Sequence, residues 1–278
     1  MSVTPHPATA EECDRIWPAA KSERLFESVE ELRAYREGAP WRVRVTDRGE
    51  ASVLGVWREH LDVLAMRGVW CAERHVAAFV ADARVVACEQ GQRRVMSPLL
   101  PVSVLGRYLA GGMRISQRIV AIQGMPDLVL PAGPPVGVGL RLGSEADIPA
   151  LVDVDEACFD DFWRYGASEL AEMRKHERLV VAHTDDGELI GYTLATVSRG
   201  AATLGRLGVA PSARRCGLAR TLVADVAAWS VRAGASTLTL CTQEENSASR
   251  ALYASMGLHE IEDRYAFAMV DACEEGRS

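Results

Sequence analysis

A stretch rich in proline and glycine interrupts the middle of the chain and limits what can form on either side of it. Between Met125 and Gly139 it holds Pro126, Pro131, Gly133, Pro134, Pro135 and Gly137. Neither a helix nor a central strand continues through such residues. We therefore predict an interdomain linker over residues 126–137, between an N-terminal domain of residues 1–125 and a C-terminal domain of residues 138–278. A chain of 278 residues accommodates two domains of moderate size.

The C-terminal domain reads as alternating strands and helices of an α/β fold. Ser144, followed by acidic residues, is typical of a helix N-cap. The turn Asp185-Asp186-Gly187 joins two β-branched stretches into a hairpin. The predicted elements are strand 138–142, helices 144–159 and 168–178, strands 179–183, 189–197 and 203–209, helix 215–233, strand 237–240, helix 246–256, and a strand pair within 258–270.

The N-terminal domain carries an echo of the C-terminal one. Tyr108 precedes Gly112 by the same spacing with which Tyr253 precedes Gly257. A strand meander over 41–45, 52–57 and 61–70 is followed by a helical stretch over 73–83. We interpret this half as a degenerate repeat, with an unrelated α/β domain as the alternative.

Charge and cysteine content exclude several classes. The net charge of -7 and a pI of about 5.5 argue against a nucleic-acid-binding protein. The seven cysteines include no Cys-x-x-Cys pair, so neither a zinc site nor a complete disulfide framework is indicated, and reduced thiols in a cytoplasm are expected. Cys216 and Cys241 are predicted to be buried rather than nucleophilic. Residues 1–7 lack a basic patch leading into an apolar run, and we expect no export and no membrane insertion.

The segment from Arg214 to Arg220 has the character of an anion site. It lies between the strand that ends at Val209 and the next helix, so its backbone N–H groups stand at a helix N-terminus. Gly217 and Ala219 leave room for a phosphate to approach the backbone. The glycine patterns of a Walker loop and of a dinucleotide fold are both absent.

Taken in order, these pieces resemble the GNAT superfamily of acetyl-CoA-dependent N-acetyltransferases. The resemblance rests on Leu207-Gly208-Val209-Ala-Pro211, Arg214-x-x-Gly217-x-Ala219, Asn246 and Tyr253-x-x-x-Gly257, and covers roughly residues 138–270. The layout of the whole chain is similar to tandem-domain members such as mycothiol synthase, without implying that substrate.

The resemblance implies two GNAT-like domains, each with a mixed, mostly antiparallel sheet that is splayed at the cofactor cleft and flanked by helices. By resemblance, the strand before the phosphate loop carries a bulge, and its residues Leu207, Gly208 and Val209 pair with the pantetheine arm. The pyrophosphate of acetyl-CoA is expected on Arg214, Arg215, Cys216, Gly217, Leu218, Ala219 and Arg220. Asn246 is either a cofactor contact or a helix N-cap.

The same resemblance gives Tyr253 the role of general acid near the sulfur, with a tyrosine packed between helix and sheet as the alternative. No general base is assigned. The candidates are more typical of solvated charge, namely Glu156, Asp160, Asp161, His183, Glu244 and Glu245. After Trp70 the N-terminal half runs without glycine where the phosphate signature would stand, so we expect it not to bind coenzyme A but to shape the acceptor cleft or cover the sheet edge.

The sequence therefore predicts an acetyltransferase that acts on a primary amine of a small molecule or peptide, without a metal. An acceptor amine of low pKa is favoured because no strong base is evident. A noncatalytic acetyl-CoA-binding sensor is the alternative from another class. An acyl group longer than acetyl and a homodimer both stay open.

Overall fold

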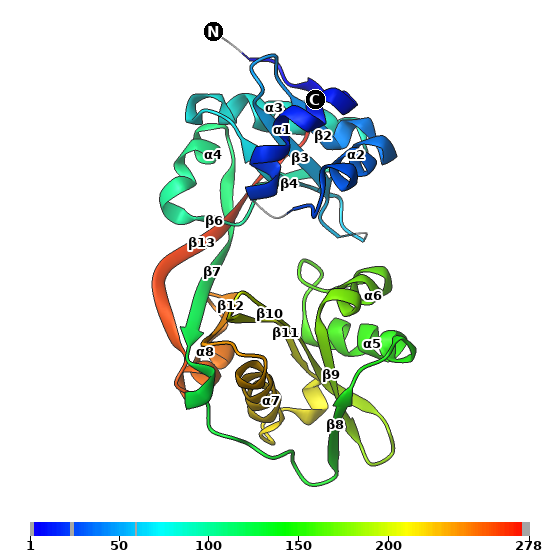
Figure 1. Ribbon diagram of the computed structural model, residues 1–278, viewed down its shortest axis with the longest axis vertical. Helices are drawn as coiled ribbons and strands as arrows, with labels where there is room; N and C mark the ends of the chain where they lie inside the picture. The colour runs from blue at the N-terminus through cyan, green and yellow to red at the C-terminus, as the bar shows by residue number, and fades with distance from the viewer. Residues whose placement is uncertain (1–2, 23–24, 59, 274–278) are drawn as a thin grey trace, which may run out of the picture. The chain divides into compact units, whose positions relative to one another are not determined.

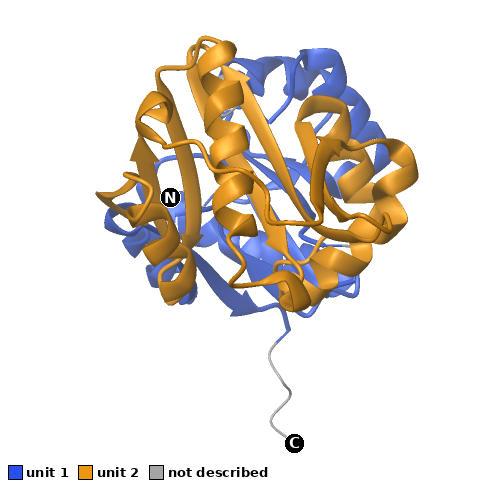
Figure 2. Cartoon of the chain, turned by 90° about the horizontal axis from the view of Figure 1, so that it is seen from below, with its two compact units in different colours: residues 1–118, 265–278 blue, residues 119–264 orange. Residues whose placement is uncertain are grey.

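The computed structural model describes residues 3–22, 25–58 and 60–273 (Figure 1). The chain forms two compact units, coloured separately in Figure 2. The N-terminal unit consists of residues 1–118 and 265–278, and the C-terminal unit of residues 119–264. These bounds differ from those of the predicted domains, because the segment 119–137 groups with the C-terminal unit and the chain's last residues group with the N-terminal one.

The C-terminal unit has the predicted order of elements. Ser144, the predicted N-cap, forms a capping box with Asp147 at the start of this helical segment. The predicted strand pair within 258–270 was wrong, because one strand runs through the polar residues 262–264 without a turn. The elements are β7 (Arg114–Gly124, from residue 119), β8 (Val138–Leu142), α5 (Ile148–Cys158), α6 (Ala167–His176), β9 (Arg178–Thr184), β10 (Leu189–Ser198), β11 (Ala201–Val209), α7 (Leu218–Arg232), β12 (Thr237–Gln243), α8 (Ser247–Ala254) and β13 (His259–Asp271).

The sheet of this unit runs β7-β12-β11-β10-β9-β8, and every pair is antiparallel except β11 with β12. Leu151 of α5 and Leu170 of α6 pack with Tyr192 and Leu194 on one side of the sheet. Val223 and Val226 of α7 belong to a second core cluster, which also holds Tyr253 and Met256 of the α8 region. The unit is thus a sheet with a helix pair on each face.

Strands β11 and β12 pair only over part of their length. The pairing runs from Ala201 opposite Thr237 to Leu204 opposite Leu240, whereas β11 continues to Val209 and β12 to Gln243. At the same point the register of β11 against β10 shifts, which leaves Gly205 as the extra residue of a β-bulge. The predicted bulge and splay are therefore confirmed, and we call the opening beyond Leu204 the fork.

The N-terminal unit repeats this plan. Its β4 pairs in parallel with β5 and carries a bulge at Arg67 against β3. The Tyr108 carbonyl accepts from the Met113 N–H at 3.2 Å, as the Tyr253 carbonyl accepts from the Leu258 N–H at 3.1 Å. The elements are β1 (His6–Pro7), α1 (Ala10–Ser22), α2 (Val29–Gly38), β2 (Val43–Val45), β3 (Ala51–Val56), β4 (Val63–Trp70), α3 (Val76–Glu89), β5 (Arg94–Met96), β6 (Leu100–Pro101) and α4 (Gly106–Ala110).

Each unit completes its sheet with a strand from a distant part of the sequence. In the C-terminal unit, residues 119–124 of β7 pair with β12, and Val120 and Ile122 lie in its core. In the N-terminal unit, the last part of β13 pairs with β5 and buries Ala266 and Ala268. A chain cut in the proline-rich segment would therefore take a core strand from each unit.

The cysteines depart from the sequence prediction at three places. Cys88 of α3 and Cys273, which are 185 residues apart, form a disulfide within the N-terminal unit. Sequence spacing gives no sign of it, because only the fold brings the end of the chain beside α3. Cys216 and Cys241 are exposed, so their predicted burial was wrong. No helix in the described part of the chain is long and apolar enough to cross a membrane.

Replacing Ile122 by alanine should lower the free energy of unfolding of the C-terminal unit by about 2–5 kcal/mol, because a buried side chain is removed and a cavity is left. Gln123→Ala is the matched control, because the Gln123 side chain is exposed on the same strand. This control should change the free energy of unfolding by less than about 0.5 kcal/mol. Urea denaturation of the full chain measures both. Equal effects would mean that residues 119–124 are not part of this core.

Candidate functional site

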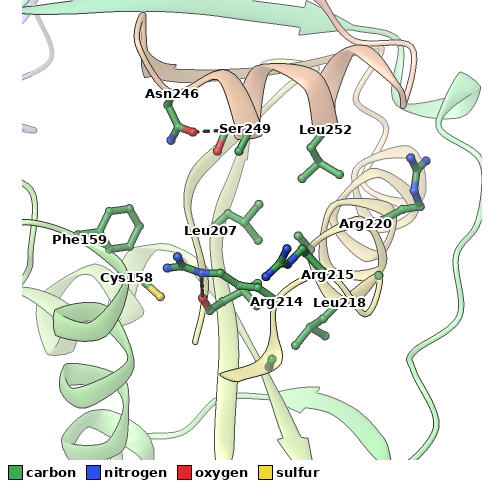
Figure 3. Close-up of a pocket in the computed structure, with 15 residues that line it drawn as sticks. Cys158, Phe159, Leu207, Arg214, Arg215, Leu218, Arg220, Asn246, Ser249 and Leu252 are labelled. Carbon is green, nitrogen blue, oxygen red and sulfur yellow. Dashed lines mark hydrogen bonds between the residues drawn. The ribbon is translucent and has the colours of Figure 1, made fainter. Parts of the chain in front are cut away.

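A cavity of about 540 Å³ opens in the C-terminal unit where β11, the N-terminus of α7, the start of α8 and the end of α5 meet (Figure 3). Most of the cofactor residues predicted from sequence line it: Leu207, Val209, Arg214, Arg215, Gly217, Leu218, Ala219, Arg220 and Asn246. The lining also includes residues that the sequence analysis did not name: Cys158, Phe159, Ala213, Ala248, Ser249 and Leu252.

The backbone before α7 is bent into an anion-binding shape. Arg215 has a φ of 62° and Gly217 a φ of 94°, so two nearby residues lie in the left-handed region. Gly217 is the N-cap of α7 and offers no side chain to the first N–H groups of this 15-residue helix. A left-handed turn at an uncapped helix N-terminus presents several N–H groups to one point. The loop therefore fits a phosphate group.

Arginine side chains add positive charge around this loop. Arg214 Nε donates to the Val209 carbonyl at 3.1 Å, and an Arg220 guanidinium nitrogen donates to Ser255 Oγ at 2.6 Å. Arg215 is exposed and forms no hydrogen bond or ion pair with the residues that the structure describes. Its guanidinium is therefore available to an anionic ligand.

The edge of β11 beyond the fork offers main-chain groups that β12 does not pair, although the Val209 carbonyl accepts from Arg214 Nε. The Ala210 N–H donates to the Ile190 carbonyl at 2.9 Å, which fixes the alternation of the bonds between β10 and β11. In an antiparallel pair the next residue but one repeats the pattern, so the main-chain groups of Leu207 and Val209 point away from β10, towards the fork. An extended ligand can pair with this edge as an added strand.

Asn246 has one of its two predicted roles. Its Oδ1 accepts from the Ser249 N–H at 3.1 Å, so it is the N-cap of α8. Because it also lines the cavity, a ligand contact stays a prediction. Ala248, Ser249 and Leu252 follow on one face of α8, and helical spacing from Asn246 could have found them.

Three predicted residues lie outside the cavity lining. A Cβ built on Gly208 would lie 2.7 Å from the Tyr192 ring, on the face of the sheet away from the cavity. Cys216 is exposed, and its Sγ donates to the Ala213 carbonyl at 3.0 Å. Tyr253 is 5% exposed in the core, and burial raises its pKa to about 12. Because Tyr253 does not line the cavity, its role as general acid stays a prediction.

Residues 148–258 match the model of the acetyltransferase (GNAT) family. The C-terminal half therefore contains a GNAT domain. No curated protein matches the chain. One solved structure with a similar fold is a GCN5-related N-acetyltransferase of Sphaerobacter thermophilus, at 18% identity over 98% of this chain and 96% of that one, with a TM-score of 0.66. A tandem GNAT protein from the clavulanic acid biosynthesis pathway is 16% identical over 99% of each chain, with a TM-score of 0.69. A GCN5-related N-acetyltransferase of Kribbella flavida is 14% identical over 82% of this chain and 88% of that one, with a TM-score of 0.58. The family and the fold support acyl transfer in general.

A buried ion pair fixes the wall of the GNAT cavity that α5 contributes. Arg206 of β11 donates to both carboxylate oxygens of Asp155, at 2.6 and 2.9 Å, and Asp155 also accepts from the Tyr192 hydroxyl. The Arg206 guanidinium lies 3.4 Å from the centre of the Phe159 ring. It also donates to the Trp163 carbonyl at 2.8 Å. This network holds the end of α5 and the loop after it against β11.

Most of the carboxylates considered as general bases are engaged elsewhere. Glu156 and Asp161 pair with Arg164, and Glu244 lies 3.8 Å from Arg264. Asp160 accepts from the Phe162 N–H at 3.0 Å. Neither these residues nor His183 and Glu245 line the cavity. In the described part of the chain, no cluster of three or more His, Cys, Asp or Glu is placed to bind a metal.

The N-terminal unit has a side chain where the GNAT domain has its anion loop. At the N-terminus of α3, Glu50 accepts from the Ala72 N–H at 2.9 Å and contacts His75 Nδ1 at 2.8 Å. Burial alone would raise the pKa of Glu50, but the hydrogen bonds from Ala72 and His75, together with the charges of His75 and Arg48, lower that pKa. An internal carboxylate thus lies at the turn that leads into α3, where the GNAT domain has its anion loop.

Two substitutions at Arg215 distinguish the effect of its left-handed backbone from the effect of its charge. Arg215→Ala and Arg215→Gly both remove the guanidinium, but only glycine adopts a φ of 62° without strain. We expect the glycine variant to be more stable than the alanine variant by roughly 1–2 kcal/mol, as measured by urea denaturation. Equal stabilities would show that Arg215 does not hold this conformation in solution.

Proposed function

We propose that this chain is an acetyl-CoA-dependent N-acetyltransferase that moves an acetyl group from coenzyme A to a primary amine of a small molecule or peptide by direct transfer. One observation carries the proposal: within a GNAT domain, a single cavity joins an uncapped helix N-terminus surrounded by arginines to an unpaired strand edge. The first fits a pyrophosphate and the second fits an amide-bearing arm.

Each part of the cavity has a role in this reaction. The loop from Arg214 to Gly217 would bind the pyrophosphate, and the Leu207 and Val209 main chain would pair with the pantetheine arm. A main-chain N–H that faces the fork can donate to the thioester carbonyl oxygen as charge develops there. Tyr253, with a pKa of about 12, keeps its proton at neutral pH and so could return one to the departing thiolate.

The alternative function is a noncatalytic acetyl-CoA-binding sensor. It is supported by Tyr253, which does not line the cavity, and by the engagement of most of the candidate bases with other residues. Both functions require acetyl-CoA binding, and they differ in whether an amine is acetylated.

Three further features stay predictions. The N-terminal unit is expected not to bind coenzyme A, which Glu50 at the start of α3 supports. A homodimer and a cytoplasmic location are compatible with the proposal.

Acetyl-CoA binding tests the donor site. Asparagine and aspartate adopt a positive φ more readily than other residues with a side chain, so the two variants share the strain at Gly217 and differ in charge. We expect micromolar binding by the wild type in calorimetry, a modest loss in Gly217→Asn, and a loss of at least about 100-fold in Gly217→Asp, in which a carboxylate faces the pyrophosphate. If the wild type fails to bind acetyl-CoA, the loop is only a structural turn and the proposal fails.

Thiol release from acetyl-CoA tests turnover with a panel of amines: glycinamide, 6-aminohexanamide, alanylalanine, glucosamine and spermidine. At pH 7 an α-amine is roughly 10–20% neutral, whereas an amine of lysine type is well under 1% neutral. Glycinamide should therefore react faster than 6-aminohexanamide by about tenfold or more. Equal rates would contradict the preference for a low-pKa amine. Binding without turnover of any panel amine would favour the sensor.

A further inference from the structure

We propose that Glu177 is the general base of the acetyl transfer, acting through one water molecule. The proposal rests on the proposed function. Glu177 is the C-cap of α6 and stands directly before β9, outside every motif that identifies the GNAT domain in the sequence.

The fold brings this carboxylate to the fork. Glu177 Oε2 lies 3.2 Å from the position that a Cβ on Gly205 would occupy. Gly205 is the bulge residue at which β11 leaves β12. The contact places the Glu177 carboxylate directly beside the bulge residue, at the start of the fork.

Glu177 lies close to the main chain that would hold the thioester. It contacts the position of Gly205, and Leu207, whose main chain faces the fork, follows two residues later, about 6.6 Å along an ideal strand. Because the carboxylate lies beside Gly205 and not beside Leu207, the proposal places one water molecule between the carboxylate and the amine. Thr203, Gly205 and Cys241 are exposed at the fork, so an acceptor can reach it.

The surroundings of Glu177 leave its carboxylate free to accept a proton. Glu177 is half-buried, and although its main-chain N–H donates to the Met173 carbonyl, its carboxylate forms no hydrogen bond or ion pair with any residue in 3–22, 25–58 or 60–273. The arginines of neighbouring elements are engaged, Arg178 with Asp225 and Arg206 with Asp155. Burial raises the pKa of Glu177 above its usual value, and the opposing effect of the neighbouring His176 is smaller.

A half-buried carboxylate without a partner lowers the stability of the fold, because no hydrogen bond or ion pair offsets its loss of hydration. A role in chemistry would account for it, since a base with a raised pKa is better matched to neutral pH. The pairing of Glu156, Asp161 and Glu244 with arginines shows the contrast.

The proton balance of the step is complete. The acceptor enters as an ammonium ion, and one proton passes through the water to Glu177, which leaves a neutral amine. The amine nitrogen forms a bond to the acetyl carbon, and the carbon–sulfur bond breaks. Tyr253 gives its proton to the departing thiolate, which becomes the free thiol of coenzyme A, and takes up the second amine proton in its place, while Glu177 releases its proton to solvent.

The test compares Glu177→Gln with Glu188→Gln, an exposed carboxylate in the turn between β9 and β10. Both full-length variants are measured for acetyl-CoA binding by calorimetry, and for kcat with the panel amine that the wild type acetylates fastest. We expect Glu177→Gln to bind acetyl-CoA within about twofold of the wild type and to lose roughly 100-fold or more in kcat. Glu188→Gln should match the wild type in both.

Two further readouts exclude a merely structural role. The wild-type kcat should rise with pH through the pKa of Glu177, because only the deprotonated carboxylate accepts a proton, and this limb should be absent in Glu177→Gln. Added formate should restore part of the rate of Glu177→Ala but not change that of Glu188→Gln. A Glu177→Gln variant that keeps half of the wild-type kcat overturns the role of Glu177 and leaves the acetyltransferase standing. A wild type that acetylates no panel amine overturns both.

Discussion

The separation of β11 from β12 after Leu204 is the constraint on which the rest of the C-terminal unit depends. A strand that leaves its neighbour exposes main-chain N–H and C=O groups, and natural proteins do not leave such an edge unprotected without a reason. Here the bulge at Gly205 turns β11 away, and the edge it exposes borders the cavity at Leu207 and Val209. The open edge follows from this one backbone irregularity, and the anion loop begins where the open edge ends.

A buried ion pair holds β11 in place beyond the bulge, on the face of the sheet that α5 covers. Directly after the bulge, Arg206 turns into the layer of α5 and meets Asp155, which is fully buried. A buried ion pair is costly to form and more costly to break, so it contributes less to stability than to a fixed arrangement. It holds α5 on a strand that β12 no longer supports, and with α5 it places Phe159 at the cavity.

Local sequence predicted what local physics determines. The glycine at 217, the helix after it and the strand before it are neighbours in the chain, so the anion loop was predictable and its residues line the cavity. Asn246 was predictable as a cap because capping involves residues three apart. Cys158 and Phe159, the strand 119–124, the disulfide of Cys88 with Cys273 and the contact of Glu177 with Gly205 depend on long-range packing. No spacing rule encodes such contacts.

The two units show how one fold keeps or loses a site. Both have a parallel strand pair, a bulge before the helix and a buried tyrosine ahead of a left-handed glycine. At the helix N-terminus they differ, since α7 has an uncapped glycine and α3 has the carboxylate of Glu50. The Glu50 carboxylate accepts from the Ala72 N–H in the turn that leads into α3, and its negative charge would repel a phosphate there. The fold survives this exchange because it needs such N–H groups satisfied, whereas the site needs them free.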